Sequence, residues 1–255
     1  ADSKEASTSG HPVMGLTALI PARGGSKGVP RKNVKSLGDH PLLSYSIAVC
    51  KLSKNIDKIF VSTDDEIIAH TAETYGAIVP GMRPAHLASD TSTDWDVINH
   101  FFENNSGDEV VYLRPTTPLR SHLLLDICIK AYANNKDNAT GFRSMHELPE
   151  SPHKMLMVED GYCKGFFEDF NGIKDYTNLP RQTFPKGYQP NGYIDIVKRS
   201  TVEEGKTAFG TKIFPFVTPP VTEIDTMEEF EYLQYKIKRQ QNNDILFYLN
   251  NLGTK

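Results

Sequence analysis

Short apolar segments alternate with longer amphipathic segments over the first 144 residues, and this alternation constrains the fold more than any other feature. The apolar runs have strand length, and the amphipathic stretches have helical spacing. Predicted strands cover 16–21, 58–62, 109–113 and 139–144, and predicted helices cover 41–52, 66–75, 94–104 and 122–134. Strands joined by helices need crossover connections, which place them side by side in a parallel sheet. We expect an α/β protein with a Rossmann-like, mostly parallel sheet and helices on both faces.

The pattern changes near residue 145. Residues 145–188 are rich in proline, glycine and aromatic residues, and 155–162 is typical of a hairpin. We expect this segment, the excursion, to leave the sheet. Its apolar residues suit a surface that binds a partner.

Strand and helix patterns return after the excursion. Residues 192–197 and 212–217 are predicted strands. Thr226 and Glu229, three residues apart, predict a capping box that opens a final helix ending near Arg239. The main domain is therefore expected to comprise 14–144 and 189–255.

Composition excludes several classes of protein. The chain has 28 Lys and Arg against 32 Asp and Glu, so bulk charge gives it no affinity for nucleic acid. No apolar run approaches the roughly 20 residues that a membrane span needs. Three cysteines without a CxxC pair favour neither a disulfide framework nor a cysteine metal site, which indicates a reducing compartment, the cytoplasm. Residues 1–13 are polar and unpatterned, so we expect a leader outside the fold, with the natural start near Met14.

The loop after the first predicted strand carries the strongest chemical signal. Residues 21–33 combine three glycines with the cations Arg23, Lys27, Arg31 and Lys32. Glycines let backbone N–H groups approach an anion closely, and the cations add positive charge. Ligands of open α/β sheets bind at the carboxyl ends of strands, where this loop begins. The pattern predicts a phosphate site, against the alternative of a solvated basic turn.

Two other motifs are considered for this loop. It is neither a Walker A sequence nor a GxGxxG dinucleotide loop. Residues 24–28 formally match GxSxG, the nucleophile elbow of hydrolases. An elbow continues directly into a helix, whereas residues 29–32 continue an irregular cationic loop, so a hydrolase is disfavoured.

Residues 21–28 with Lys32 and Asn33 resemble the N-terminal signature of the CMP-sialic acid synthetases, the acylneuraminate cytidylyltransferases. Further blocks of that family fit in order and spacing at 61–64, 83–90, 114–120, 180–182 with 190–192, and 223–226. The resemblance spans residues 16 to about 240 and implies a nucleotidyltransferase type of α/β fold. It also implies the reaction, in which the anomeric hydroxyl of a nine-carbon 2-keto sugar acid attacks the α-phosphate of CTP and releases pyrophosphate.

The resemblance implies a nucleotide site at the cationic loop. Arg23, Ser26, Lys27 and Lys32 suit the triphosphate, and Asn33, Arg83 and Ser89 are expected around base and ribose. The nucleotide-binding residues are thus Arg23, Gly24, Gly25, Ser26, Lys27, Lys32, Asn33, Arg83 and Ser89, and the catalytic residues are Arg23, Lys27, Lys32 and Asp225. For Arg83, the alternative is a surface arginine.

Glu223 and Asp225 are the expected ligands of Mg²⁺. On an extended segment their side chains face the same side, and Mg²⁺ prefers carboxylates together with phosphate oxygens. The family usually has Asp at the first position, so Glu223 is a departure. The alternative is that Asp225 only caps the helix that follows.

The expected sugar pocket departs from the family at several positions. Members that use N-acetylneuraminate carry Gln where this chain has Arg114, Arg where it has Gln189, and Tyr where it has Asp195. An aromatic pair of the family is reduced to Phe209. The expected acceptor-binding residues are Arg114, Thr116, Lys154, Arg181, Gln189, Asn191, Asp195 and Phe209. A related nonulosonate such as legionaminate or pseudaminate, or another 2-keto sugar acid, therefore stays open as the acceptor.

Lys154 and Arg181 match family positions that bring cations into the partner subunit's site. The resemblance thus implies a homodimer with composite sites, built through residues 145–188; the alternative is two solvated cations. Two other functions stay open. The same fold could use another nucleotide, as a guanylyltransferase does, or the chain could bind a nucleotide without catalysis.

Overall fold

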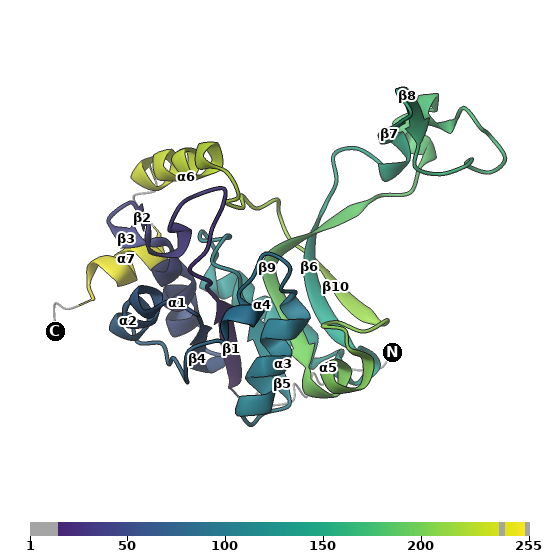
Figure 1. The fold of residues 1–255 in the computed structure, drawn as a ribbon. Coiled ribbons are helices and arrows are strands. Elements are labelled where there is room, and N and C mark those ends of the chain that lie inside the picture. The colour runs from purple at the N-terminus through teal and green to yellow at the C-terminus, as the bar shows by residue number, and fades with distance from the viewer. Residues whose placement is uncertain (1–14, 240–242, 253–255) are drawn as a thin grey trace, which may run out of the picture.

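The structure, a computed structural model, describes residues 15–239 and 243–252 (Figure 1). The expected leader and the expected start at Met14 lie outside these residues. A six-stranded sheet with the order β10-β6-β9-β5-β1-β4 forms the centre of the molecule. Its strands are β1 (Leu16–Pro21), β4 (Ile56–Ser62), β5 (Glu109–Tyr112), β6 (Gly141–Glu147), β9 (Tyr188–Lys198) and β10 (Ile213–Val217).

One strand departs from the parallel arrangement. β1 pairs in parallel with both β4 and β5, and β10 pairs in parallel with β6. β9 is antiparallel to its neighbours β5 and β6. The reason lies in the connection: the chain leaves the sheet at the end of β6, forms the excursion, and returns at the same edge. It has no crossover helix to carry it to the opposite edge.

Helices cover both faces of the sheet, as predicted. They are α1 (Leu42–Leu52), α2 (Glu66–Thr74), α3 (Asp94–Asn104), α4 (His122–Ala133), α5 (Arg199–Gly205), α6 (Met227–Arg239) and α7 (Asp244–Asn250). Side chains alternate along β1: Ala18 and Ile20 pack in the larger core with α1, α4 and α6, whereas Leu19 packs in a second core with α3 and α5. This two-faced burial is the expected doubly covered α/β layer structure.

Side-chain caps fix where several helices begin. Asp65 accepts a hydrogen bond from the backbone N–H of Ile68 at the start of α2, and Ser121 caps α4. Thr93 and Asp96 form a reciprocal capping box at the start of α3. α5 and α7 are additional short helices that the sequence pattern did not indicate. None of the described helices is long and apolar enough to cross a membrane.

The excursion lies away from the sheet, at the end of two extended strands (Figure 1). β6 continues to Glu147 and β9 begins at Tyr188, so the part that leaves the sheet is 148–187. It contains the hairpin of β7 (Leu156–Glu159) and β8 (Tyr162–Gly165), and its own aromatic cluster, in which His153 stacks on Phe184. Many of its large apolar side chains are exposed: Met155, Leu156, Val158, Tyr162, Phe166, Phe167 and Ile173.

Candidate active site

Loops from several strands meet at one edge of the sheet. β1, β4 and β5 run in the same direction, so the loops that follow them, 22–31, 63–65 and 113–121, lie at the edge formed by their carboxyl ends. The first half of β9 reaches the same edge because that strand is antiparallel. This is the edge at which open α/β sheets bind ligands.

Two cations of the loop after β1 converge on Asp90. The carboxylate of Asp90 lies 3.1 Å from Arg23 Nη2 and 2.5 Å from Lys27 Nζ. Arg23 also donates to the backbone oxygen of Ser89, at 2.8 Å. The hydrogen bond from Lys27 holds the pKa of Asp90 below its usual value. The loop therefore places two positive charges side by side, and both contact the same carboxylate, that of Asp90.

Lys32 joins the cationic loop to the late acidic segment. Its Nζ donates to the backbone oxygen of Ile224 at 2.7 Å and lies 3.6 Å from the Asp225 carboxylate. Gly28 packs on the same segment, where a Cβ atom would lie 1.9 Å from the Asp225 carbonyl oxygen. Only glycine fits here, because the backbone of Gly28 lies so close to the Asp225 carbonyl. This packing and the contacts of Lys32 hold the cationic loop against the acidic segment.

Other contacts fix the backbone of the loop. The Gly24 N–H donates to Asp64 at 2.9 Å, and the buried Asn33 donates to the Arg23 carbonyl at 2.9 Å. Arg31, the fourth cation, pairs with Asp65 at 2.6 Å and so faces the start of α2. The next regular element is a short 3₁₀ turn at Lys32–Val34, not an α-helix, so the loop is not a nucleophile elbow.

Arg83 is a buried arginine and not the surface residue of the alternative interpretation. Its side chain is 3% exposed, and its Nη2 lies 4.0 Å from Asp64. Within residues 15–239 and 243–252, its buried Nε has no hydrogen-bond partner. Burial lowers the pKa of this guanidinium. A buried donor without a partner is costly, which suits a place where a ligand oxygen binds.

One cavity of about 280 Å³ brings most of the predicted nucleotide residues together. Its walls include the predicted residues Arg23, Gly25, Ser26, Lys32, Asn33, Arg83, Ser89, Arg114 and Thr116. Asp90, Asp94 and Tyr112 complete the lining on the side of α3 and β5. Gly24 and Lys27 are not in the lining, although both contact residues of the same loops.

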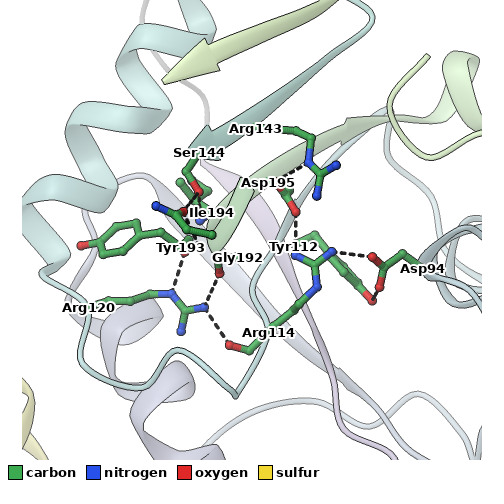
Figure 2. A network of polar contacts seen from close by, with 11 residues as sticks. Asp94, Tyr112, Arg114, Arg120, Arg143, Ser144, Gly192, Tyr193, Ile194 and Asp195 are labelled. Carbon is green, nitrogen blue, oxygen red and sulfur yellow. Dashed lines mark hydrogen bonds and ion pairs between the residues drawn. The ribbon is translucent and has the colours of Figure 1, made fainter. Parts of the chain in front are cut away.

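A charged network borders this cavity on the side of β9 (Figure 2). Arg114 donates to the fully buried Asp195 at 2.7 Å and also to Asp94. Arg143 Nε lies 3.4 Å from the other oxygen of Asp195, and the Tyr112 hydroxyl donates to Asp94 at 2.9 Å. Burial alone would lower the pKa of Arg114, but Asp195 and Asp94 raise it above its usual value. Arg114 and Asp195, two departures from the expected family pattern, are thus direct partners.

Arg120 holds the loop after β5 against β9 (Figure 2). Its fully buried guanidinium donates to the carbonyl oxygens of Tyr193 at 2.6 Å, Gly192 at 2.9 Å and Arg114 at 2.7 Å. Burial lowers the pKa of Arg120 to about 10. Gly192 adopts φ +59°, a left-handed conformation that favours glycine. These contacts fix the backbone that carries Arg114.

The predicted acidic pair lies beside the same loop. The Ile224 N–H donates to the Thr116 carbonyl at 2.9 Å, which places Glu223 and Asp225 next to the 113–121 loop. Burial and the charge of Asp225 raise the pKa of Glu223. The helix α6 is capped by Thr226, whose hydroxyl accepts from the Glu229 N–H at 3.3 Å. Asp225 is therefore not needed as the side-chain cap.

The acidic pair fits a hard divalent cation. Mg²⁺ is usually held by one or two carboxylates and completed by substrate phosphates and water. No group of three or more His, Cys, Asp or Glu side chains suited to a metal occurs among the described residues. The pKa of Glu223 is raised first by burial and then by repulsion from Asp225, and a cation between the two carboxylates would relieve that repulsion.

Several expected acceptor residues lie outside the cavity lining. Lys154 and Arg181 are in the excursion, away from the sheet (Figure 1). Gln189 is on β9 beside the base of the excursion. Asn191 is fully buried and its amide hydrogen-bonds with Ser144 of β6 and with Thr218, the residue after β10. The Phe209 ring lies 4.2 Å from the guanidinium carbon of Arg143.

Comparison with known proteins identifies the family. A sequence profile described as cytidylyltransferase matches residues 17–167, which is more than half of the chain. The chain belongs to the cytidylyltransferase family. This confirms the resemblance that the sequence blocks indicated.

Individual relatives add detail. The chain is 41% identical over 224 residues to the CMP-N,N'-diacetyllegionaminic acid synthase of Legionella pneumophila, which covers 84% of this chain and 92% of that protein. It is 28% identical over 244 residues to the N-acylneuraminate cytidylyltransferase of Escherichia coli O18:K1:H7, covering 94% of this chain. The chain spans only 56% of the length of that second relative.

A solved structure supports the fold. The structure of CMP:2-keto-3-deoxy-manno-octonic acid synthetase complexed with CTP superposes with a TM-score of 0.67, covering 89% of this chain and 99% of that one. The two sequences are 13% identical, so this likeness concerns the fold alone. The predicted α/β architecture of the nucleotidyltransferase type is confirmed.

Several residues of the site were not singled out from the sequence, among them Asp64, Asp90, Asp94 and Arg143. Asp64 and Asp90 each end a block that the sequence comparison had marked, and both contact the cationic loop. Their place at the ends of the blocks 61–64 and 83–90 was the available signal. Asp94 and Arg143 gave none, because one opens a helix and the other sits within a strand.

Proposed function

We propose that this cytidylyltransferase activates a nonulosonic acid, converting CTP and the sugar acid to CMP-nonulosonate and pyrophosphate. The cavity between the cationic loop and the Arg114 network is the observation that supports this best. One side offers positive charge for a triphosphate, and the other offers charged groups for a polar acceptor. The relatives with nonulosonate names favour this acceptor class over other sugars.

In this reaction the anomeric oxygen of the acceptor forms a bond to the α-phosphorus of CTP. The bond from that phosphorus to the bridging oxygen of the β-phosphate breaks, pyrophosphate leaves with added negative charge, and the proton of the anomeric hydroxyl passes to solvent. Positioning and charge neutralisation are the main requirements of such a transfer. We assign neutralisation to Arg23, Lys27 and Lys32, and contacts to base and ribose to Asn33, Arg83 and Ser89.

The acidic pair would hold Mg²⁺ in this scheme. Glu223 and Asp225 would each supply carboxylate oxygen, with phosphate oxygens completing the shell. When bound, the ion neutralises charge on the phosphates of CTP. Lys32 lies beside Asp225, so the carboxylates that would hold the metal and the cations of the loop would face the same phosphates.

A homodimer with composite sites would account for the excursion. Its exposed apolar side chains need cover, and its cations Lys154 and Arg181 are outside the cavity lining, in the excursion that extends away from the sheet (Figure 1). A second copy could bring both into reach.

The cysteines Cys50, Cys128 and Cys163 are free, which supports a reducing compartment such as the cytoplasm.

The first experiment is an assay of pyrophosphate release with each of the four NTPs, with and without a panel of nonulosonic acids. We expect release with CTP only, dependent on one of these acids and on Mg²⁺, and abolished by a chelator. Release with GTP and a sugar phosphate would favour a guanylyltransferase. Tight CTP binding without release would favour a non-catalytic module.

Lys27→Ala tests the phosphate role of the loop. The expected loss in kcat/KM is about 100-fold, because one preorganised charge donor contributes about 3 kcal/mol to the transition state. Arg31→Ala is the matched control, since that cation pairs with Asp65 instead. Activity of Lys27→Ala within about threefold of the parent would rule the role out, because a charge contact of this kind contributes far more.

Mixing two inactive variants tests the composite sites. Arg181→Ala and Lys27→Ala would damage different half-sites if Arg181 acts in the partner's cavity. After subunit exchange about half of the dimers are mixed, each with one intact site, so about one quarter of parental activity should return. No recovery despite demonstrated exchange would place both residues in the site of one chain. A monomer in sedimentation would remove the composite site altogether.

A further inference from the structure

One row of side chains crosses three neighbouring strands beside the cavity. In the sheet register, Tyr112 of β5 is opposite Asp195 of β9, and Asp195 is opposite Arg143 of β6. Neighbouring strands lie about 4.8 Å apart, so the backbone of Arg143 is about 10 Å from that of Tyr112. Tyr112 lines the cavity. The row therefore leads from the cavity wall at Tyr112, through Asp195, to Arg143, and these last two residues lie outside the lining.

The guanidinium of Arg143 contacts Asp195 on one side (Figure 2) and the Phe209 ring on another. Its Nε faces Asp195 at 3.4 Å, and its Cζ lies 4.2 Å from the Phe209 ring centre. No hydrogen bond engages Nη1 or Nη2 from any residue that the structure describes. The side chain is 25% exposed. Two parallel N–H donors are thus fixed in place without a protein acceptor.

The backbone that carries the ring beneath Arg143 is itself held in place. The Phe209 carbonyl accepts a hydrogen bond from Thr140 Oγ1 at 2.7 Å. Gly141 packs so closely that a Cβ atom there would lie 3.0 Å from the same carbonyl oxygen. A flat ring at this distance supports a guanidinium and sets its plane.

Charge in the network is shared unequally. Asp195 makes its shorter contact, 2.7 Å, with Arg114, and Arg114 is also paired with Asp94. Arg143 has only the 3.4 Å contact. Arg143 is therefore the cation of this network that its own chain neutralises least.

We propose that Arg143 binds the carboxylate of the acceptor through Nη1 and Nη2. This inference rests on the proposed function, since it takes the acceptor to be a sugar acid. A planar guanidinium with two parallel donors matches a carboxylate in a bidentate pair. Asp195 and Phe209 orient the guanidinium, and Arg114 holds Asp195 in place.

The test compares KM for the acceptor with KM for CTP. Arg143→Gln should raise KM for the acceptor about 30-fold, the effect of losing a charge-assisted hydrogen bond, with KM for CTP within about twofold. Arg143→Lys should recover only part of the loss, because a lysine retains charge without the fork. Arg199→Gln is the matched control: Arg199 also stacks on a ring, Phe102, but bonds backbone carbonyls at the start of α5. It should leave both KM values unchanged.

A second arm asks whether the carboxylate is the group that Arg143 binds. The substrates are a nonulosonic acid that the parent uses and the methyl ester of that acid. Esterification should lower kcat/KM strongly for the parent and only slightly for Arg143→Gln. An equal penalty in both proteins, or an unchanged acceptor KM in Arg143→Gln, would overturn the inference while the parent's activity stands. A parent inactive with every acid would overturn the proposed function and the inference together.

Discussion

Asp195 is the residue whose replacement tests the charged network most directly. Its carboxylate is fully buried and contacts two guanidinium groups, at 2.7 Å and 3.4 Å. Removing one partner of a buried ion pair typically destabilises by about 3–5 kcal/mol, because the other charge is left buried. Arg114 and Arg143 are 21% and 25% exposed, so water relieves part of that penalty. We expect Asp195→Asn to lower the free energy of unfolding by about 3 kcal/mol.

The measurement is urea unfolding followed by far-UV circular dichroism at fixed protein concentration, with a thermal scan in parallel. For a chain of this size each kcal/mol shifts Tm by about 2–4 °C, so the expected shift is about 6–12 °C. A double-mutant cycle with Arg114→Gln should give a coupling of about 2 kcal/mol, since the two residues are in contact.

Asp94→Asn is the matched comparison. Asp94 contacts the same arginine but is 40% exposed, so its loss should destabilise by no more than about 1 kcal/mol. The reasoning from burial would be refuted by an Asp195→Asn effect below about 1 kcal/mol. It would also be refuted if the two variants lost equal stability.

Two further predictions concern the segment at residues 223–226. Gly28→Ala should destabilise by about 1–3 kcal/mol and raise KM for CTP, because its Cβ would overlap the Asp225 carbonyl. Gly25→Ala meets nothing within 4 Å and should leave the unfolding midpoint unchanged; equal effects would contradict the packing argument. Thr226→Ala should lower stability by about 1 kcal/mol as a lost helix cap, with an unaltered Mg²⁺ requirement. Asp225→Asn should leave stability unchanged and raise the Mg²⁺ concentration needed for activity. Titrations of activity against Mg²⁺ would contradict this if the two variants had the same requirement.

The sequence predicted the elements better than their directions. The apolar run before the cationic loop, the start of α3 at Asp94 and the capping box at Thr226 are local features, and each lies where it was expected. The antiparallel direction of β9 could not be predicted. The spacing of apolar residues does not say in which direction a strand runs. The sequence of the excursion also has no pattern that shows at which edge of the sheet the chain re-enters.

The candidate site divides in the same way. The residues of the cationic loop are close together in the sequence, and so are the two residues of the acidic pair, so the composition of each segment was informative. The contact between Arg114 and Asp195 joins residues 81 positions apart. Each looked like an isolated departure from the family pattern until the sheet register brought them together. Arg143 was invisible for the same reason, because its neighbours are set by strand pairing.

The pairing of β6 with β9 changes register between Arg143 and Met145. Arg143 is opposite Asp195, whereas Met145 is opposite Pro190, so the residues from Asn191 to Ile194 bulge against Ser144. A slip of one residue in a plain ladder would turn every later side chain to the other face. Here the bulge, locked by the Asn191 amide, separates the ladder of the sheet from the ladder that reaches the excursion. Evolution could therefore lengthen, shorten or exchange the outer arm as a module without altering the alignment of the residues at the cavity.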